Sequence, residues 1–347
     1  MINFKILLVG DASPQDRIIF YRNAFKGLGC EVEILNTKGL YKISFLNRVL
    51  NRFILKTPVY FWTKNLNSIV VKKAIENNPD FILFFKPIYI SPTSILKIKS
   101  RGIKIFSWYP DDIFYPKNSS NFFYKSIFLY DCHFSTKSFN VKELVDFGAK
   151  RAVFLPHAVD LSCHHPVEVS TVEKEQLGAD IIFVGTYAED KRTDYLERLC
   201  QDGYDIKIYG NGWRKHPKNS CLFLKKFIKF KDAYCEDSSK IFNASKIILA
   251  FLRKHNRDAQ TGRTYEIPAC GAFMLHERTD EAKAIFKEGK EADFFGSYEE
   301  LKKKVDFYLS HEEKRREIAK NGYLKALTPP FSYDNRAEII IKTYLAL

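Results

Sequence analysis

The segment whose residue types best suit ligand binding or catalysis spans residues 257–275 and reads RDAQTGRTYEIPACGAFML. A polar stretch containing glycine leads into a predicted helix that begins near Thr264, and a second glycine leads on to an apolar strand. Carboxylate and guanidinium groups therefore gather at a helix N-terminus, whose free N–H groups and partial positive charge suit a diphosphate. Arg263 could add a bidentate donor, and Glu266 could accept hydrogen bonds from a ribose diol. The alternative is a loop with solvated charges, and spacing does not separate the two.

Glycines after two further apolar runs could bring the backbone close to a ligand. Residues 183–192 read FVGTYAEDKR, in which Gly185 lets the backbone approach a phosphate while Lys191 or Arg192 supplies charge. Residues 208–213 read IYGNGW, where the glycines could let the chain wrap around a nucleobase and Trp213 offers a stacking face. The alternatives are a solvated Lys-Arg pair and a turn beside a core aromatic residue.

Carboxylates also follow a strand in the first half of the chain. Asp111 and Asp112 come after the predicted strand 103–108, at the end where a doubly wound sheet binds its ligands. They could orient the hydroxyl groups of an acceptor or act as a general base, and a metal site or a turn rich in proline and aspartate are the alternatives. Lys86 follows the predicted strand 81–85 in the same way.

The cysteines and histidines do not indicate a metal site. The seven cysteines are odd in number and scattered without a CxxC pair, which argues against a disulfide framework and against a zinc ribbon. Cys163, His164 and His165 are consecutive but lack a second ligand pair at a convincing spacing, so we predict no metal. This cysteine usage favours a reducing cytoplasm.

Short apolar runs alternate with amphipathic stretches, which predicts parallel strands linked by covering helices. A helix at 17–28 ends at Gly29, a plausible C-cap. The polar stretch 160–178 predicts a linker between two α/β, doubly wound domains with a cleft between them. The predicted strands are 5–9, 31–35, 81–85, 103–108, 133–135, 152–155, 181–184, 205–209, 246–251 and 272–275. The predicted domains are 1–165 and 175–330, followed by a C-terminal helix within 331–347 that packs back toward the first domain.

Residues 263–271 resemble the donor-site motif of the group 1 glycosyltransferases, and more narrowly of their branch related to the spore-maturation protein CgeB, where Arg-Thr-aromatic-Glu precedes an Ala-Cys-Gly turn. In the broader group two glutamates separated by seven residues mark the donor pocket, and the matching pair here is Asp258 and Glu266. The resemblance implies that Glu266 binds the nucleotide ribose and that Asp258 approaches the donor sugar. It also implies the GT-B fold, in which two Rossmann-like domains face a central cleft, and a reaction that usually needs no metal.

A second part of the resemblance lies after the strand 181–184. Gly185 and Lys191 match the family's Val-Gly-Arg-Leu and following lysine, while Thr186 replaces the usual arginine. The resemblance therefore implies that other arginines supply part of the charge for the diphosphate. The predicted catalytic residues are Asp111, Asp112 and Asp258. The predicted donor-binding residues are Gly185, Thr186, Lys191, Arg192, Gly210, Trp213, Arg257, Arg263, Thr264 and Glu266.

The formal net charge of +14 narrows the partners to anionic ones, such as nucleic acid, anionic lipid head groups or phosphorylated substrates. Residues 42–56 predict a basic amphipathic helix that could lie on anionic lipid or simply cover a sheet, and residues 225–231 form a second basic-aromatic cluster. No run approaches the ~18 apolar residues of a membrane span. We expect a cytoplasmic protein, with peripheral contact at the inner face of the membrane as a further expectation.

Together these observations predict a glycosyltransferase that moves a sugar from a nucleotide-sugar donor to a glycan, lipid-linked or protein acceptor, in surface polysaccharide or glycoconjugate synthesis. The expected partners are donor and acceptor, without nucleic acid, and no cofactor is expected. One alternative is a basic nucleic-acid-binding protein, which the charge and the abundant Tyr and Phe favour. Another is a catalytically inactive scaffold, which the departures at Asp258 and Thr186 favour.

Overall fold

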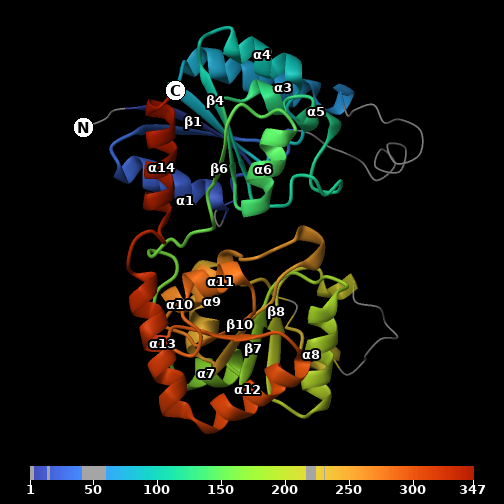
Figure 1. Cartoon of the computed structure of the whole chain (residues 1–347), viewed down its shortest axis with the longest axis vertical. Helices are drawn as coiled ribbons and strands as arrows, with labels where there is room; N and C mark the ends of the chain where they lie inside the picture. Colours follow the sequence, from blue (N-terminus) through green and yellow to red (C-terminus); the bar gives the residue numbers. More distant parts are fainter. Residues whose placement is uncertain (1–3, 14–15, 41–59, 216–223, 230) are drawn as a thin grey trace. The chain divides into compact units, whose positions relative to one another are not determined.

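The computed structural model describes residues 4–13, 16–40, 60–215, 224–229 and 231–347. They form two compact units, the first made of the residues up to Pro156 together with Tyr333–Leu347, and the second of His157–Ser332. Each unit contains a β-sheet whose described strand pairs are all parallel, with helices packed on it (Figure 1).

The sheet of the first unit has six strands in the order β2-β1-β3-β4-β5-β6. Its central strands are almost continuously apolar and buried, as expected for parallel strands covered on both faces. Every strand predicted for this half is present, with ends that differ by no more than one residue. The strands are β1 (Lys5–Gly10), β2 (Glu31–Asn36), β3 (Phe81–Phe85), β4 (Lys104–Tyr109), β5 (Cys132–Ser135) and β6 (Ala152–Phe154).

The first helix ends as the sequence predicts. Gly29 has a φ of +86°, and the N–H of Cys30 donates to the carbonyl of Phe25 at 3.0 Å, which closes the helix with a left-handed C-cap. The helices of this unit are α1 (Arg17–Gly27), α3 (Tyr60–Asn77), α4 (Pro92–Lys99), α5 (Asn121–Tyr124), α6 (Ser138–Asp146) and α14 (Tyr333–Leu345).

The last helix, α14, packs on α1 although about 300 residues separate them in the chain (Figure 1). The ring of Tyr333 lies 5.1 Å from that of Tyr21 and 5.2 Å from that of Phe20. Arg336 Nε donates to the carbonyl of Pro156 at 3.0 Å. These contacts explain why the C-terminal helix groups with the first unit.

The sheet of the second unit has five strands in the order β11-β10-β9-β7-β8. Its strands are β7 (Ile181–Val184), β8 (Ile206–Tyr209), β9 (Ile247–Ala250), β10 (Met274–Glu277) and β11 (Asp293–Phe295), the last of which we did not predict. Its helices are α7 (Thr171–Leu177), α8 (Lys191–Gln201), α9 (Cys235–Asn243), α10 (Gly262–Ala269), α11 (Asp280–Ile285), α12 (Tyr298–Ser310) and α13 (Glu312–Ala326).

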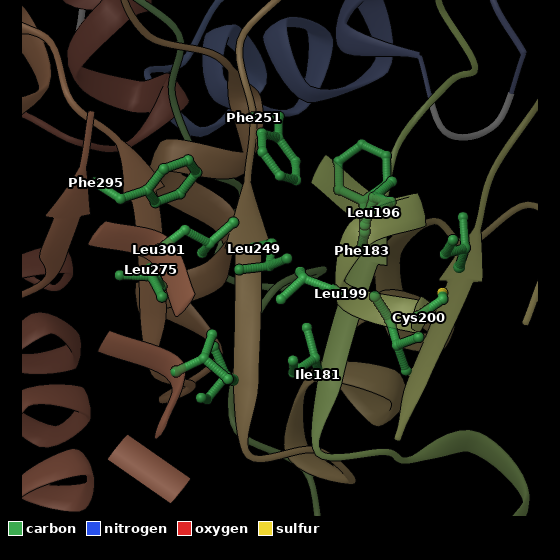
Figure 2. Close-up of a cluster of buried hydrophobic side chains, with 14 of the residues drawn as sticks. Ile181, Phe183, Leu196, Leu199, Cys200, Leu249, Phe251, Leu275, Phe295 and Leu301 are labelled. Atoms are coloured by element: carbon green, nitrogen blue, oxygen red, sulfur yellow. The ribbon is translucent and has the colours of Figure 1, made fainter. Parts of the chain in front are cut away.

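One face of this sheet buries a core in which Leu196 and Leu199 of α8 contact side chains of β7 and β9 (Figure 2). Each fully buried leucine contributes roughly 1.5–3 kcal/mol to stability. These contacts come from the second and third turns of α8, and they fix the position of that helix on the sheet.

The polar stretch 160–178, predicted as a linker, is an integral part of the second unit. The N–H of Val167 donates to Asn243 Oδ1 at 2.7 Å, and Ser239 Oγ donates to the carbonyl of Cys163 at 3.3 Å. Helix α7 forms within the stretch and begins with a capping box between Ser170 and Glu173. The units divide after Pro156, so the first ends 9 residues before its predicted end (165 − 156) and the second begins 18 residues before its predicted start (175 − 157), because contacts with α9, which lies far away in sequence, hold this segment.

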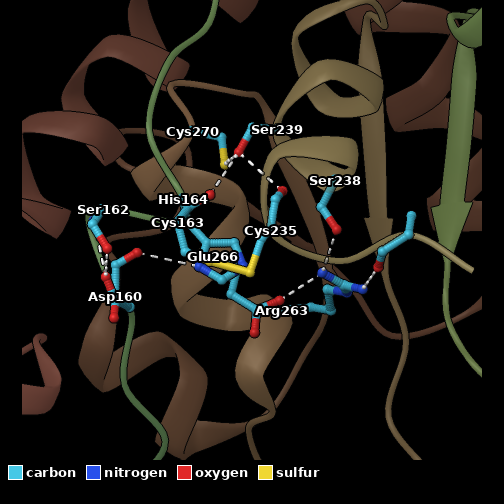
Figure 3. Close-up of a disulfide and its surroundings, with 11 residues drawn as sticks. Asp160, Ser162, Cys163, His164, Cys235, Ser238, Ser239, Arg263, Glu266 and Cys270 are labelled. Carbon is cyan, nitrogen blue, oxygen red and sulfur yellow. Dashed lines mark hydrogen bonds and ion pairs between the residues drawn. A yellow bond between two sulfur atoms is a disulfide. The ribbon is translucent and has the colours of Figure 1, made fainter. Parts of the chain in front are cut away.

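A disulfide joins Cys163 to Cys235, 72 residues later in the chain, which corrects the prediction that the cysteines form no disulfide (Figure 3). The odd number of cysteines and the absence of a CxxC motif do not reveal this pair, because only folding brings these two distant residues together. Of the cysteines in the described ranges, four are free thiols and buried. These are Cys30, Cys132, Cys200 and Cys270.

Of the two basic surface features predicted from the sequence, the described residues include part of one and none of the other. The predicted basic amphipathic helix at 42–56 lies outside the described residues, as does residue 230 of the basic-aromatic cluster. No helix in the described ranges has the length and apolar character needed to cross a membrane.

We predict that Cys163→Ser lowers the free energy of unfolding by about 2–4 kcal/mol, because the cross-link restricts a long loop in the unfolded chain. Urea denaturation of parent and variant measures the change. Reductant should lower the parent to the value of the variant and leave the variant unaffected. Equal stability of parent and variant without reductant would contradict the cross-link.

Candidate functional site

Helix α10 begins with a buried polar chain that holds its first turn. Thr264 is fully buried, and its hydroxyl accepts the N–H of Thr261 at 3.0 Å and lies 2.9 Å from His276 Nε2. His276 Nδ1 lies 2.5 Å from the carbonyl of Glu277, which can only accept, so Nδ1 carries the hydrogen and Nε2 accepts from Thr264. Burial lowers the pKa of His276 to about 4, which keeps the ring neutral. The Thr264 hydroxyl is thus buried and bonded within the unit, and the structure does not support its predicted role in donor binding.

Arg263 and Glu266 lie together one turn apart on α10, as predicted. The Arg263 guanidinium donates to Glu266 Oε2 at 2.6 Å and to the carbonyl of Val184, the last residue of β7, at 3.3 Å. It also donates to the carbonyl of Ala233 at 3.2 Å and to Ser238 Oγ at 3.4 Å. The side chains of this pair remain 23% and 13% exposed. The pair therefore sits at the carboxyl end of β7 with a small accessible surface.

The disulfide between Cys163 and Cys235 lies beside this pair, and the residue pattern did not predict this arrangement (Figure 3). Buried His164 follows Cys163 directly, and its Nδ1 lies 3.3 Å from the carbonyl of Asp160. Burial lowers the pKa of His164, while the nearby Glu266 carboxylate opposes that change. Because Cys163 is cross-linked and His164 is enclosed, this segment forms a structural junction beside α10.

Gly185 and Gly210, which follow β7 and β8, allow their two backbone segments to pack closely. A Cβ on Gly210, whose φ is +123°, would lie 2.3 Å from the carbonyl oxygen of Gly185. Trp213 is 2% exposed, donates its indole N–H to that same carbonyl at 2.9 Å, and packs against the ring of Phe183. The predicted stacking face is therefore wrong, and the core-aromatic alternative holds for Trp213. Gly210 is explained by packing, while Thr186 lies exposed at the turn.

The two basic residues at the start of α8 differ in exposure and in their partners. The Lys191 ammonium is half-exposed and forms an ion pair with the carboxylate of Glu277, the last residue of β10. Arg192 is 4% exposed and shares a face of α8 with Leu196, and its Nε donates to Asp190 Oδ1 at 2.8 Å. Lys191 thus keeps the accessibility that a phosphate ligand requires, whereas Arg192 is enclosed and its predicted contact with the donor is not supported.

Asp258, predicted to approach the donor sugar, is instead enclosed within its own loop. Its side chain is 0% exposed, and Oδ2 accepts the N–H of Arg253 at 3.2 Å and Nε of the same residue at 3.0 Å. Asn256 Nδ2 donates to Oδ1 at 2.6 Å. Arg257 is exposed in a left-handed backbone conformation. A tight loop must satisfy its polar groups, and Asp258 does so here, which corrects its assignment as catalytic.

In the first unit the two neighbouring aspartates have different surroundings. Asp111 Oδ2 lies 2.6 Å from the Nζ of Lys86, which joins the carboxyl ends of β3 and β4. Asp112 is 3% exposed, and its Oδ1 accepts the N–H of Phe114 at 3.1 Å and Asn140 Nδ2 at 3.2 Å. Asp112 therefore builds the turn, as the alternative reading has it, and does not act as a catalytic group. Asp111 retains a partly exposed carboxylate at the sheet edge.

Part of the chain matches a known protein family. Residues 192–342 match the family model described as glycosyl transferase-like. No curated protein shows significant sequence similarity to the chain. The narrower resemblance to the CgeB-like branch stays a prediction.

Solved structures that match over nearly the whole chain include the following three. A glycosyltransferase from Rickettsia africae ESF-5 has a TM-score of 0.68 and 14% identity, covering 99% of this chain and 98% of that one. Sucrose-phosphate synthase from Thermosynechococcus elongatus has a TM-score of 0.69 and 10% identity, covering 99% of both chains. HepE from Anabaena, in complex with UDP and glucose, has a TM-score of 0.68 and 12% identity, covering 99% and 100%. The chain therefore has the GT-B fold, with two Rossmann-like domains built on parallel sheets.

We predict that stability falls as the pH drops from about 6.5 to 4, partly because of His276. The unfolded histidine binds a proton near pH 6.5 but the folded one only near pH 4, so acid favours unfolding by roughly 1–2 kcal/mol at pH 5. Urea denaturation at pH 7 and pH 5 measures this loss. His276→Gln should lose less stability over that interval than the parent, and the exposed His165→Gln should lose as much as the parent. Equal losses in the His276→Gln variant and the parent would contradict a neutral buried ring.

Proposed function

We propose that this protein is a glycosyltransferase that takes a sugar from a nucleotide-sugar donor bound at the start of α10. The observation that carries this proposal is the Arg263–Glu266 pair at the carboxyl end of β7, inside the region that matches the glycosyl transferase-like model. Carboxyl ends of parallel strands are where doubly wound sheets bind ligands. HepE, which shares the fold, has been solved with UDP and glucose.

In this proposal each accessible group has a distinct part. Glu266 accepts hydrogen bonds from the ribose hydroxyls, and Arg263 orients its carboxylate through the 2.6 Å contact. Lys191 meets the diphosphate beside the turn at Gly185. Negative charge that develops on the departing nucleoside diphosphate is then stabilised by Lys191 and by the helix start, without covalent chemistry on the protein. We propose that these cations suffice without a metal or another cofactor.

We place acceptor handling in the first unit, at Asp111. Its carboxylate is held by Lys86 at 2.6 Å and remains 13% exposed, so it can orient or deprotonate an acceptor hydroxyl group. The acceptor classes are a glycan, a lipid-linked sugar or a protein, within surface polysaccharide or glycoconjugate synthesis. Peripheral contact with anionic lipid at the inner face of the membrane belongs to the same proposal.

Two other functions remain as outcomes of the tests. A nucleic-acid-binding protein is favoured by the net charge of +14. An inactive scaffold is favoured by the enclosure of Asp258, which removes the first acid of the donor motif from the surface. Retention on nucleic acid without nucleotide-sugar turnover would support the first, and nucleotide binding without transfer the second.

We predict that one nucleotide class among UDP-, GDP-, ADP-, TDP- and CMP-sugars raises the melting temperature of the parent protein. Glu266→Ala and Arg263→Ala should each remove most of that thermal shift, because they remove the ribose acceptor or the group that orients it. Asp180→Asn, at the opposite end of β7, is the matched control and should keep the shift. Equal stabilisation of all four proteins would rule out this donor site.

We predict that Asp111→Asn lowers the transfer rate at saturating donor by about 10²–10⁴-fold, the range of a general base, while the thermal shift with the donor is kept. Steady-state kinetics with acceptor in excess measures the rate. Asp112→Asn should instead lower the melting temperature, because its carboxylate builds the turn. An unchanged rate for Asp111→Asn would exclude it from the reaction.

A further inference from the structure

Three elements of the second unit meet at Glu277, a residue that the sequence analysis did not single out. Glu277 is the last residue of β10, and its Oε2 accepts the N–H of Leu252, just beyond β9, at 3.1 Å. Its Oε1 pairs with the ammonium of Lys191, the first residue of α8. The carboxylate is thus fixed at the edge of the sheet where the donor's phosphates are proposed to lie.

The two members of this ion pair differ in how firmly the fold holds them. The Glu277 side chain is 12% exposed and is anchored to a strand end, whereas the Lys191 side chain is 42% exposed and has a flexible four-carbon stem. Within the described residues, no carboxylate other than Glu277 lies within ion-pair distance of Lys191. An anionic ligand can therefore draw the lysine away while the glutamate stays in place.

Arg263, the other cation of the site, is not available in this way. Its guanidinium donates to the carbonyls of Val184 and Ala233 as well as to Glu266, so it is held by backbone groups that do not move independently. Of these two cations, Lys191 is the one whose partner is a single side chain. Exchange of partners is consequently expected at Lys191.

We propose that Glu277 is a positioning residue, a counter-ion that Lys191 exchanges for the donor's diphosphate and that recovers the lysine when the nucleoside diphosphate leaves. This inference rests on the proposed function. A carboxylate with little exposed surface that loses its cation is destabilised, because it is only partly solvated. Glu277 therefore weakens diphosphate binding and speeds the release of the product.

The test uses Glu277→Gln, which removes the charge but keeps an oxygen that can accept the N–H of Leu252. Binding is measured by calorimetry at low ionic strength with the nucleoside diphosphate that stabilises the parent, and with the corresponding nucleoside. We expect the variant to bind the diphosphate about threefold to tenfold more tightly, and the nucleoside with unchanged affinity. In steady state, the KM for the donor and kcat should both fall, because product release slows.

Asp180→Asn is the matched control for charge. Asp180 pairs with Lys246 at 2.7 Å just before β7, at the opposite edge of the sheet, and its substitution changes the net charge by the same amount. This control should bind the diphosphate as the parent does. A gain in the control equal to that of Glu277→Gln would attribute the effect to overall charge and overturn the inference.

A second comparison separates exchange of the lysine from direct repulsion by Glu277. The Lys191→Gln variant and the Lys191→Gln/Glu277→Gln double variant should bind the diphosphate equally, because Glu277 acts through the lysine. Tighter binding by the double variant would show direct repulsion and overturn the exchange, as would unchanged or weaker binding by Glu277→Gln. If the parent binds no nucleotide, the proposed function itself fails, and that result is distinct from all of these.

Discussion

The Arg263 guanidinium ties the start of α10 to the carboxyl end of β7, since it donates to the Val184 carbonyl while it pairs with Glu266. Strand ends carry carbonyl groups without partners in the sheet, and a planar cation with several N–H groups can satisfy more than one of them. The same side chain reaches Ala233 and Ser238, so the segment around the start of α9 is held as well. If this cation were absent, Glu266 would lose the partner that orients its carboxylate.

Polar groups near this edge separate into those that build the site and those that stay accessible. Thr264 and Asp258 are enclosed, and their bonds shape a helix start and a loop. Buried polar groups are costly unless they are paired, so each of these residues is used for structure first. Lys191 and Glu266 keep exposed surface, and the proposed donor binding rests on them.

The first unit repeats this arrangement with different residues. Lys86 and Asp111 pair where β3 and β4 end, again at the carboxyl edge of a parallel sheet. The GT-B fold is shared with proteins of 10–14% identity that have different names, including a sucrose-phosphate synthase. A fold of this kind supplies positions for functional groups, and the side chains at those positions determine the reaction.

Local chemistry alone predicted the parallel strands, the C-cap at Gly29 and the placement of Arg263 and Glu266 one turn apart at a helix start. Apolar runs, a left-handed glycine and an i, i+3 spacing act between near neighbours, so they can be read directly from the order of residues. The burial of Trp213, the enclosure of Asp258, the Cys163–Cys235 bond and the Lys191–Glu277 ion pair could not be predicted in this way. Each of them depends on a partner that is distant in the chain or on the packing of a particular loop. Such contacts exist only after the sheet has brought the strand ends together.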